Sequence, residues 1–432
     1  MRTKARVDLE PPVLNNGSQV TGENKDKFRR ENKRRRKLKQ IGQLNEPDWW
    51  TTYNGMFTLP PPVPRPENYR NNMCPANLAT QHPAAQQLLQ YAIHGCPTQT
   101  GQPWTKELMQ AAIDKGPHIS ALVPAAVEQL RLEVAAKVLA NQARVVRWMD
   151  IRSNPPPELK ISPIAMIEHK SKPFRAILDL SFPITLSDKS VHPSVNEATV
   201  KTAPQRAIDQ LGQALQRIIY AFATTDPKAK IFMAKWDIKD GFWRLDCADR
   251  EKWNFCYVLP NLDKAAPIEL VVPTSLQMGW IESPPYFCAA SETARDIATQ
   301  YAETKLGSLP NHKFLPLTQL HQDFQTLPNT TASKEIKYIM EVYMDDYITA
   351  AIATEQHHLN HLANATMYGI HDVFPPDIND ATDPISEHKL HKDGAWALVK
   401  DILGLTFDGD EKTVWLDDDK RQALLTLLHS WI

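Results

Sequence analysis

Residues 342–349 read Val-Tyr-Met-Asp-Asp-Tyr-Ile-Thr, with two adjacent carboxylates between two short apolar runs. The runs 339–344 and 347–351 are rich in β-branched and aromatic residues, which predicts two strands. We therefore expect Asp345-Asp346 at the two-residue tip of a hairpin. Two like charges on a tight turn repel each other unless a cation offsets them, and Mg²⁺ prefers such hard oxygen ligands. The pair indicates a metal site, although an isolated Asp-Asp is more often an ordinary turn.

A second candidate ligand, Asp237, stands near the end of the apolar run 231–238, which predicts another strand. Taken alone, an Asp in this position is most simply a strand-end cap. Together with Asp345 and Asp346 it would complete a carboxylate cluster for two Mg²⁺ ions. Such ions sit roughly 3.5–4 Å apart in sites that catalyse in-line phosphoryl displacement. Mn²⁺ is an alternative to Mg²⁺ at a site of this kind.

Segments around both carboxylate sites resemble, in chain order, the motifs of retroelement reverse transcriptases. The resemblance covers about residues 155–432 and is to the long-terminal-repeat or tyrosine-recombinase type of retrotransposon. The matching segments are 173–180 (fingers), 237–242 (first palm motif), 275–280 with Ser283-Pro284 (template grip), Tyr343-Met344-Asp345-Asp346 (the catalytic YMDD signature) and 402–407 (primer-grip hairpin).

The resemblance implies a role for each matching residue. Asp237, Asp345 and Asp346 would be the catalytic carboxylates and the metal ligands. The residues implied to bind the incoming dNTP are Arg175, Lys170, Phe242, Gln277, Met278 and Gly279. Those implied to contact primer or template are Tyr343, Met344, Leu403 and Gly404.

The chemistry of the implied dNTP residues agrees with these roles. Arg175 offers a planar fork for bidentate phosphate binding, although a surface Arg at a strand start would look the same. A ring at Phe242 would fill the space that a ribose 2′-hydroxyl needs, and the alternative is a core Phe. Gly279 permits close approach of the backbone to the nascent base pair. The order Gln277-Met278-Gly279 departs from the commoner forms of the family's motif.

The resemblance implies an α+β right-hand polymerase fold, with palm and fingers, an N-terminal helical extension and an incomplete thumb. We expect a disordered basic tail over 1–48, a proline-rich connector and helical extension over 49–154, fingers and palm over 155–399, and the primer-grip hairpin with the start of the thumb over 400–432. Periodicity predicts helices over 107–113, 123–148, 208–223 and 283–301, strands over 164–168 and 176–180, and a first thumb helix over 420–428. Residues 302–335 and 371–395 are expected as irregular loops.

The charge is unevenly distributed. Residues 1–40 hold 13 Lys/Arg and 5 Asp/Glu, a net of +8. Subtracting these from the totals of 49 and 50 leaves 36 basic and 45 acidic residues, a net of −9. The basic run 25–39 predicts a nuclear-import signal or a phosphate-binding arm, with a solvated basic helix as the alternative. The acidic remainder counts against a nucleic-acid enzyme.

The five cysteines are odd in number and lack C-x-x-C spacing, which favours neither a disulfide framework nor a zinc site. No secretory signal or membrane-length apolar run occurs, so an intracellular location, cytoplasmic or nuclear, is expected. The resemblance implies RNA-directed DNA synthesis on an RNA or DNA template with a primer and dNTPs. Further polyprotein domains (RNase H, integrase or recombinase) would lie outside this chain.

Two other functions remain open. One is an inactive or domesticated retroelement fragment that only binds nucleic acid. The other is an RNA-dependent RNA polymerase, but that family favours Gly before the Asp pair and a small residue at the sugar gate. Met344 and Phe242 argue against it.

Overall fold

The computed structural model describes residues 84–169, 172–263, 265–320, 337–376 and 383–431. The chain divides into two compact units, 1–47 and 48–432, and all the described residues belong to the second. The boundaries expected at 154 and 399 fall inside this second unit. The basic tail, most of the connector and Lys170 lie outside the described residues. Within the described ranges, no helix is long and apolar enough to cross a bilayer.

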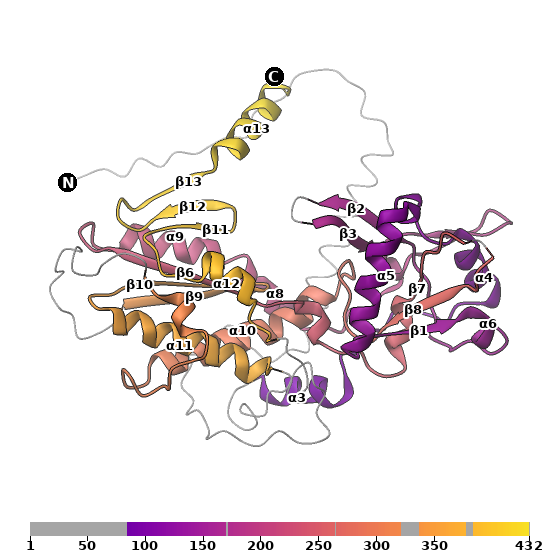
Figure 1. Cartoon of the computed structure of the whole chain (residues 1–432), viewed down its shortest axis with the longest axis horizontal. Coiled ribbons are helices and arrows are strands. Elements are labelled where there is room, and N and C mark those ends of the chain that lie inside the picture. The colour runs from indigo at the N-terminus through magenta and orange to yellow at the C-terminus, as the bar shows by residue number, and fades with distance from the viewer. Residues whose placement is uncertain (1–83, 170–171, 264, 321–336, 377–382, 432) are drawn as a thin grey trace, which may run out of the picture. The chain divides into compact units, whose positions relative to one another are not determined.

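The fold mixes helices and sheets around one central antiparallel sheet. Its strands are β6 (Ile231–Asp237), β9 (Lys337–Tyr343) and β10 (Asp346–Ile352), in the order β6-β10-β9. The helices α10 (Ser283–Ala302) and α11 (Gln356–Val373) pack on each other and against this sheet (Figure 1). The predicted strand 231–238 and the predicted hairpin are confirmed as strands.

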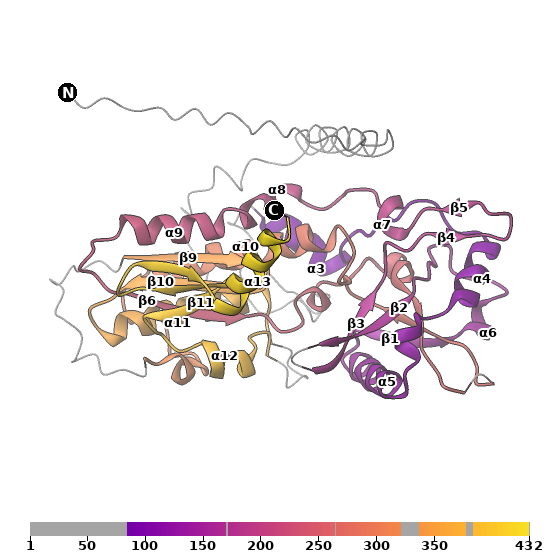
Figure 2. The same cartoon turned by 90° about the horizontal axis from the view of Figure 1, so that it is seen from above.

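Alternate residues of β6 face two different cores, as the two-residue period of a strand requires. Phe232 and Trp236 join the core shared with α10 and α11. Ile231 and Met233 join a second core with the helix α9 (Ala214–Thr224), which runs alongside β9 (Figure 2). Because both faces of the sheet are covered, β6 and the central strand β10 are buried almost throughout, whereas β9 is buried only over 340–342.

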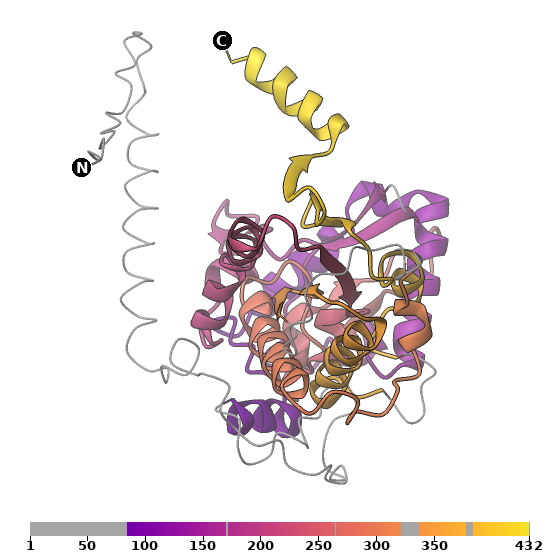
Figure 3. The same ribbon diagram turned by 90° about the vertical axis from the view of Figure 1, so that its left-hand side faces the viewer.

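The C-terminal strands form a separate small sheet, in the order β11-β12-β13. Its members are β11 (Val399–Ile402), β12 (Leu405–Asp408) and β13 (Thr413–Leu416). Ile402 and Phe407 pack into the second core beside β6. The helix α13 (Asp418–His429) follows and has no buried residue, and Figure 3 shows it beyond this sheet. The hairpin expected over 402–407 and the helix expected over 420–428 are both confirmed as secondary structure.

In the described part of the chain, the residues that precede α10 build three smaller sheets besides β6. These are β1-β8-β7, β2-β3 and β4-β5, whose strands are β1 (Ala143–Arg147), β2 (Ile164–His169), β3 (Lys172–Leu178), β4 (Ile184–Thr185), β5 (Val191–His192), β7 (Tyr257–Val258) and β8 (Glu269–Pro273). The remaining helices are α3 (Ala85–His94), α4 (Lys106–Lys115), α5 (Pro124–Leu139), α6 (Trp148–Ile151), α7 (Val195–Ala198), α8 (Gln205–Leu211) and α12 (Glu387–Asp393). Short 3-10 turns η2 to η5 span Ile119–Leu122, Gly241–Arg244, Glu251–Phe255 and Leu315–Thr318.

Two helix predictions and one loop prediction are wrong in their bounds. The helix predicted over 123–148 ends at Leu139, and 143–147 instead form β1, because the left-handed Asn141 redirects the chain to pair with β8. The helix predicted over 208–223 is two helices, broken at Gly212-Gln213. The expected loop 371–395 contains the end of α11 and the whole of α12.

Candidate active site

The turn of the central hairpin lies one residue earlier than predicted. Met344 and Asp345 form the turn, and Asp346 is already the first residue of β10. In this register Tyr347 pairs with Val342, and both side chains are buried in the same core. A tip at Asp345-Asp346 would instead pair Tyr343, which is 39% exposed, with the buried Ile348. Burial of one face therefore decides the register, and Met344 accepts a φ of 59° to close the turn.

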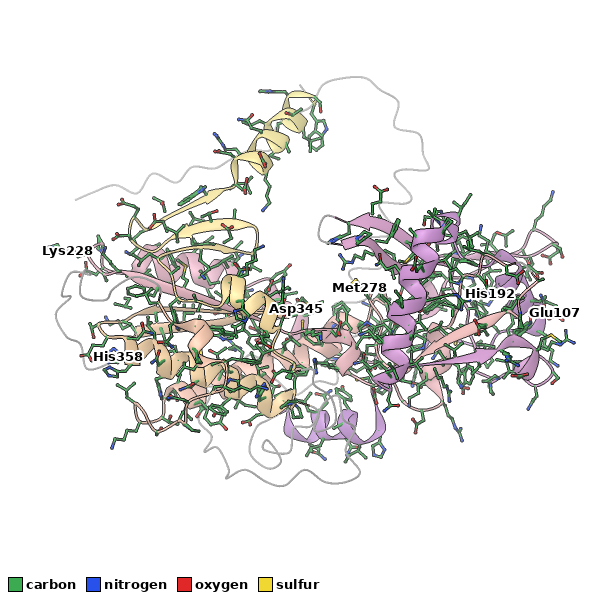
Figure 4. All side chains as sticks on the ribbon, viewed as in Figure 1. Glu107, His192, Lys228, Met278, Asp345 and His358 are labelled. Atoms are coloured by element: carbon green, nitrogen blue, oxygen red, sulfur yellow. The ribbon has the colours of Figure 1, made fainter. Side chains whose placement is uncertain are left out.

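The structure brings the three predicted carboxylate residues to one end of the central sheet. Asp346 lies directly opposite Asp237 in the β10–β6 pair, so their side chains leave the sheet on the same face. Asp345, the residue before Asp346, lies in the turn. Its carbonyl accepts the Ile238 N–H at 3.0 Å. Figure 4 labels Asp345 at this end of the hairpin. Sequence reasoning therefore predicted the grouping, although not the turn itself.

The site holds more negative charge than its surroundings offset. Asp237 is only 6% exposed, and burial, with Asp345 and Asp346 adding to it, raises its pKa to about 7. Burial and the neighbouring Asp346 also raise the pKa of Asp345. Hard carboxylate oxygens in this state suit a divalent cation, which would favour their ionised form. The donor set therefore fits Mg²⁺ in chemical type.

A lysine that the sequence analysis missed faces this site. The Lys389 ammonium of α12 bonds the Asp237 carboxylate. Burial acts to lower the pKa of Lys389, but the bond to Asp237 outweighs it and the pKa is raised. Within the described ranges, no three Asp, Glu, His or Cys side chains already converge as metal ligands do. The signal that could have revealed Lys389 is Ser386-Glu387, a helix start inside the expected loop.

The implied dNTP residues come from separate segments, and two of them meet. Arg175 on β3 points an Nη2–H at the Met278 Sδ, at 2.9 Å. Met278 is 48% exposed and is labelled in Figure 4. Gln277 is buried instead, and its amide donates to the carbonyls of Ser275 and Leu276. These bonds leave Met278, rather than Gln277, available to a ligand.

Gly279 is required by close packing within the protein. It adopts a φ of 99°, and a Cβ there would lie 3.0 Å from the Leu178 carbonyl oxygen. Its own carbonyl accepts from the Asn196 amide at 2.8 Å. The loop 277–279 is thereby fixed against β3, the strand that carries Arg175.

Phe242 lies in the 3-10 turn η3, directly after the loop that follows Asp237. Its ring packs edge-on against Phe287 of α10, with centroids 5.5 Å apart, and it is partly buried. Asp240, at a φ of 57°, begins the turn and pairs with Lys137 of α5 at 3.1 Å. Phe242 therefore lies at the margin of the hydrophobic core, in the segment that directly follows Asp237.

The implied primer residues lie on two hairpins. Tyr343 ends β9 half-exposed, and the Met344 Sδ lies 3.5 Å from the Cys288 Sγ. Leu403 and Gly404 form the β11–β12 turn, at φ values of 50° and 86°. β11 lies beside β6, where the Lys235 Nζ donates to the Asp401 carbonyl at 2.8 Å.

A cavity lies elsewhere in the described part of the chain. It has a volume of about 780 Å³ and is lined by residues of α4, α6 and the β4–β5 turn, among them Glu107, Trp148 and Asp188. None of the predicted site residues that the structure describes lines it. Its volume alone therefore does not identify the reactive site.

No family model and no curated protein matches this chain. Two solved structures show a weak overall likeness: the foamy viral protease-reverse transcriptase in complex with dsDNA, and its dRH form in complex with dsDNA. Each superposes with a TM-score of 0.40, at 12% and 13% identity, over 79% of this chain. The chain spans about half the length of these proteins, 53% and 44% respectively.

Proposed function

We propose that this chain is an RNA-directed DNA polymerase that joins a dNTP to a primer 3′-hydroxyl and releases pyrophosphate. The observation that carries the proposal is the position of Asp237, Asp345 and Asp346 at one end of the central sheet, where Asp346 lies opposite Asp237 and Asp345 stands in the adjoining turn. Asp237 is buried and Asp345 is partly buried, and both have raised pKa values, a state typical of functional sites. The YMDD signature and its companion motifs give the reaction class by resemblance.

In this proposal Asp237 and Asp345 hold the cations, with Asp346 beside them. Two Mg²⁺ ions, when bound, would supply charge stabilisation to the attacking and leaving oxygens. Lys389 would neutralise Asp237 when no metal is present and would move aside for it, because its side chain is 54% exposed. The protein's contribution is then to hold the three carboxyl groups together at one end of the sheet, where bound cations would favour their ionised form.

The remaining residues would bind and select the nucleotide. Arg175 would leave Met278 for the triphosphate, where its guanidinium can donate two parallel hydrogen bonds. Phe242 would stand against the sugar and exclude a 2′-hydroxyl, since Phe287 behind it resists displacement. Tyr343 and the Leu403-Gly404 turn would contact the primer strand.

Primer extension tests the proposal. The full chain is given an RNA template, a DNA primer, Mg²⁺ and labelled dNTPs, beside Asp345→Asn and the distant surface variant Asp188→Asn. Wild type and Asp188→Asn should extend the primer, and Asp345→Asn should lose at least about 10³-fold in rate, since catalytic metal sites supply several kcal/mol. A parallel reaction with rNTPs separates this function from RNA synthesis.

A second candidate is nucleic-acid binding without catalysis, which the net charge of +8 in residues 1–40 favours. Binding of the primer–template by wild type and Asp345→Asn alike, with no incorporation by either, would support it. Extension by wild type alone would exclude it.

A further inference from the structure

A chain of polar contacts links the loop after α10 to the segment that precedes α12. The Phe314 N–H donates to Nδ1 of His312 at 3.2 Å. Nε2 of His312 lies 3.2 Å from Nδ1 of His371 on α11. Nε2 of His371 lies 2.8 Å from Oδ1 of Asp383. Three segments distant in sequence are thus joined end to end.

The Phe314 N–H fixes the direction of every hydrogen bond in this series. Since Nδ1 of His312 accepts a hydrogen bond, a neutral ring carries its proton on Nε2 and donates it to His371. His371 then carries its own proton on Nε2 and donates it to Asp383. A further proton on Nδ1 of His312 would face the Phe314 N–H, so the His312 ring is neutral while this series of hydrogen bonds is intact.

Electrostatics agree with a neutral His312 ring. Burial, and then the adjacent His371, lower the pKa of His312 to about 4. The other charged groups that face His312 are Asp383 and Lys313. The nearby Asp372 of α11 is engaged with the Tyr301 hydroxyl of α10, at 2.8 Å.

Asp383 receives more bonds than the one from His371. Its Oδ1 also accepts the Ile385 N–H at 2.9 Å, and its Oδ2 lies 2.6 Å from the Lys313 Nζ. Burial acts to raise its pKa, but the bonds from His371 and Lys313 bring it to about 2. Arg244, from η3, donates to its backbone carbonyl at 3.4 Å. Asp383 is therefore ionised. It contacts His371 of α11 through its carboxylate and Arg244 of η3 through its backbone carbonyl.

The three residues after Asp383 support the candidate active site through their main chain. The Lys239 N–H donates to the Pro384 carbonyl, and the Ser386 N–H donates to the Asp237 carbonyl, both at 2.8 Å. α12 begins directly after Ser386 and carries Lys389 to the Asp237 carboxylate. Both the backbone and the side chain of Asp237 are thus held by the segment that Asp383 anchors.

We propose that Asp383 is a positioning residue of this site: held by His371 and Lys313, it fixes the main chain of 384–386 against Asp237 and aims Lys389 at its carboxylate. His312 keeps His371 in the orientation and tautomer that Asp383 needs. The catalytic consequence rests on the proposed function, whereas the structural link to Asp237 can be measured without any activity.

Amide hydrogen exchange on the full chain measures that link. Asp383→Asn should speed exchange of the Lys239 and Ser386 amides by at least about tenfold, because both bonds open more often. The matched control is Asp372→Asn, another buried Asp near this loop, bonded to Tyr301 rather than to the 383–386 segment. It should leave both amides unchanged. If Asp383→Asn fails to fold, Lys313→Met removes only the half-exposed cation and should speed the same two amides by about threefold.

Kinetics then separate positioning from simple loss of stability. Asp383→Asn should lower kcat for primer extension by about 10–100-fold and leave KM for dNTP within about threefold, since misplaced groups lose rate rather than binding.

A pH series adds a second signature. After correction for intrinsic exchange, protection of the Lys239 and Ser386 amides in wild type should fall as the pH drops from 6 to 4. His312→Gln, whose amide keeps the donor toward His371 but cannot be protonated, should retain protection over that range.

Unchanged exchange in Asp383→Asn, or equal acceleration in Asp372→Asn, would overturn the proposal. Altered exchange together with no primer extension by wild type would reject the proposed polymerase function and leave the positioning role of Asp383 standing.

Discussion

The ionised carboxylate of Asp237 lowers the stability of the folded protein. A carboxylate that is 6% exposed is costly to ionise, and its pKa of about 7 records that cost. Its nearest cation, Lys389, is more than half exposed and offsets it only in part. In the proposed function, a metal ion bound to the ionised carboxylate would offset this cost.

Asp237→Asn should therefore stabilise the metal-free protein, and more so at higher pH. The folded-state pKa is raised above the unfolded value of about 3.8. The free energy of unfolding of wild type therefore falls as the pH rises from 4 through 7. Asn cannot ionise, so its advantage in the free energy of unfolding should be near zero at pH 4 and on the order of 2–4 kcal/mol at pH 8. Urea unfolding in EDTA at the two pH values measures it.

Added Mg²⁺ provides the control for that experiment. The cation should raise the stability of wild type at pH 8 and not that of Asp237→Asn, because a ligand stabilises only the state that binds it. An advantage of the variant that is the same at both pH values would contradict a buried, titrating Asp237.

At the scale of elements, the helices α10 and α11, which both pack against the central hairpin, approach each other closely. Gly369 of α11 lies so close to α10 that an added Cβ would be 2.6 Å from the Ala298 nitrogen and 2.7 Å from the Ala294 oxygen. The two backbones approach this closely only because Gly369 has no side chain. The opposing atoms belong to the main chain, so they cannot move aside as a flexible side chain would.

Gly369→Ala should destabilise the protein although Ala is the better helix former. The gain in helix propensity is about 1 kcal/mol, whereas overpacking a closed contact typically costs 1–3 kcal/mol. We expect a net loss of about 1 kcal/mol in urea unfolding. Gly212→Ala is the matched control, because its φ is −65° and its nearest neighbour is 3.9 Å away. A loss in Gly212→Ala as large as that in Gly369→Ala would refute the packing argument.

The same helix shows why sequence reasoning missed some elements. α11 buries polar as well as apolar side chains: His361 faces the Ala302 carbonyl, Asn364 accepts the His312 N–H, and Thr366 meets Thr349. Leu359, Leu362, Ile370 and Val373 nevertheless recur at helical spacing, so the 3.6-residue signal was present and the sequence analysis overlooked it among these polar residues. Strands β6, β9 and β10 were predictable because their β-branched and aromatic runs are short and bounded.

The candidate site follows the same pattern. The three carboxylates and the Leu403-Gly404 turn stand in local motifs and could be predicted. Lys389 and Asp383 reach the site only through tertiary contacts, because residues 383–386 pack against the end of β6. No spacing within the sequence encodes such a return, so only the structure brings them to Asp237.

At the scale of the whole molecule, charge separates the chain into two parts. The first 40 residues carry a net of +8, and the remainder carries −9. A polyanion such as a primer–template is repelled by the net charge of the remainder at long range and attracted by that of the N-terminal residues. We therefore expect the N-terminal cations to supply most of the sequence-independent affinity, and the carboxylate site to supply the chemistry.

Replacing the Lys and Arg residues of 25–39 by Gln tests this division without changing the chain length. Each phosphate contact contributes about −0.9 to the slope of log K against log salt for duplex DNA, so losing about five contacts should flatten the slope by 4–5. Fluorescence anisotropy with a labelled primer–template over a series of NaCl concentrations measures it, and affinity at low salt should fall about 100-fold or more. The rate of single-turnover extension at saturating protein should stay within about twofold of wild type, because these cations act on encounter and not on the reacting atoms. An unchanged slope would mean that cations of the acidic remainder, gathered into a local groove, hold the nucleic acid instead.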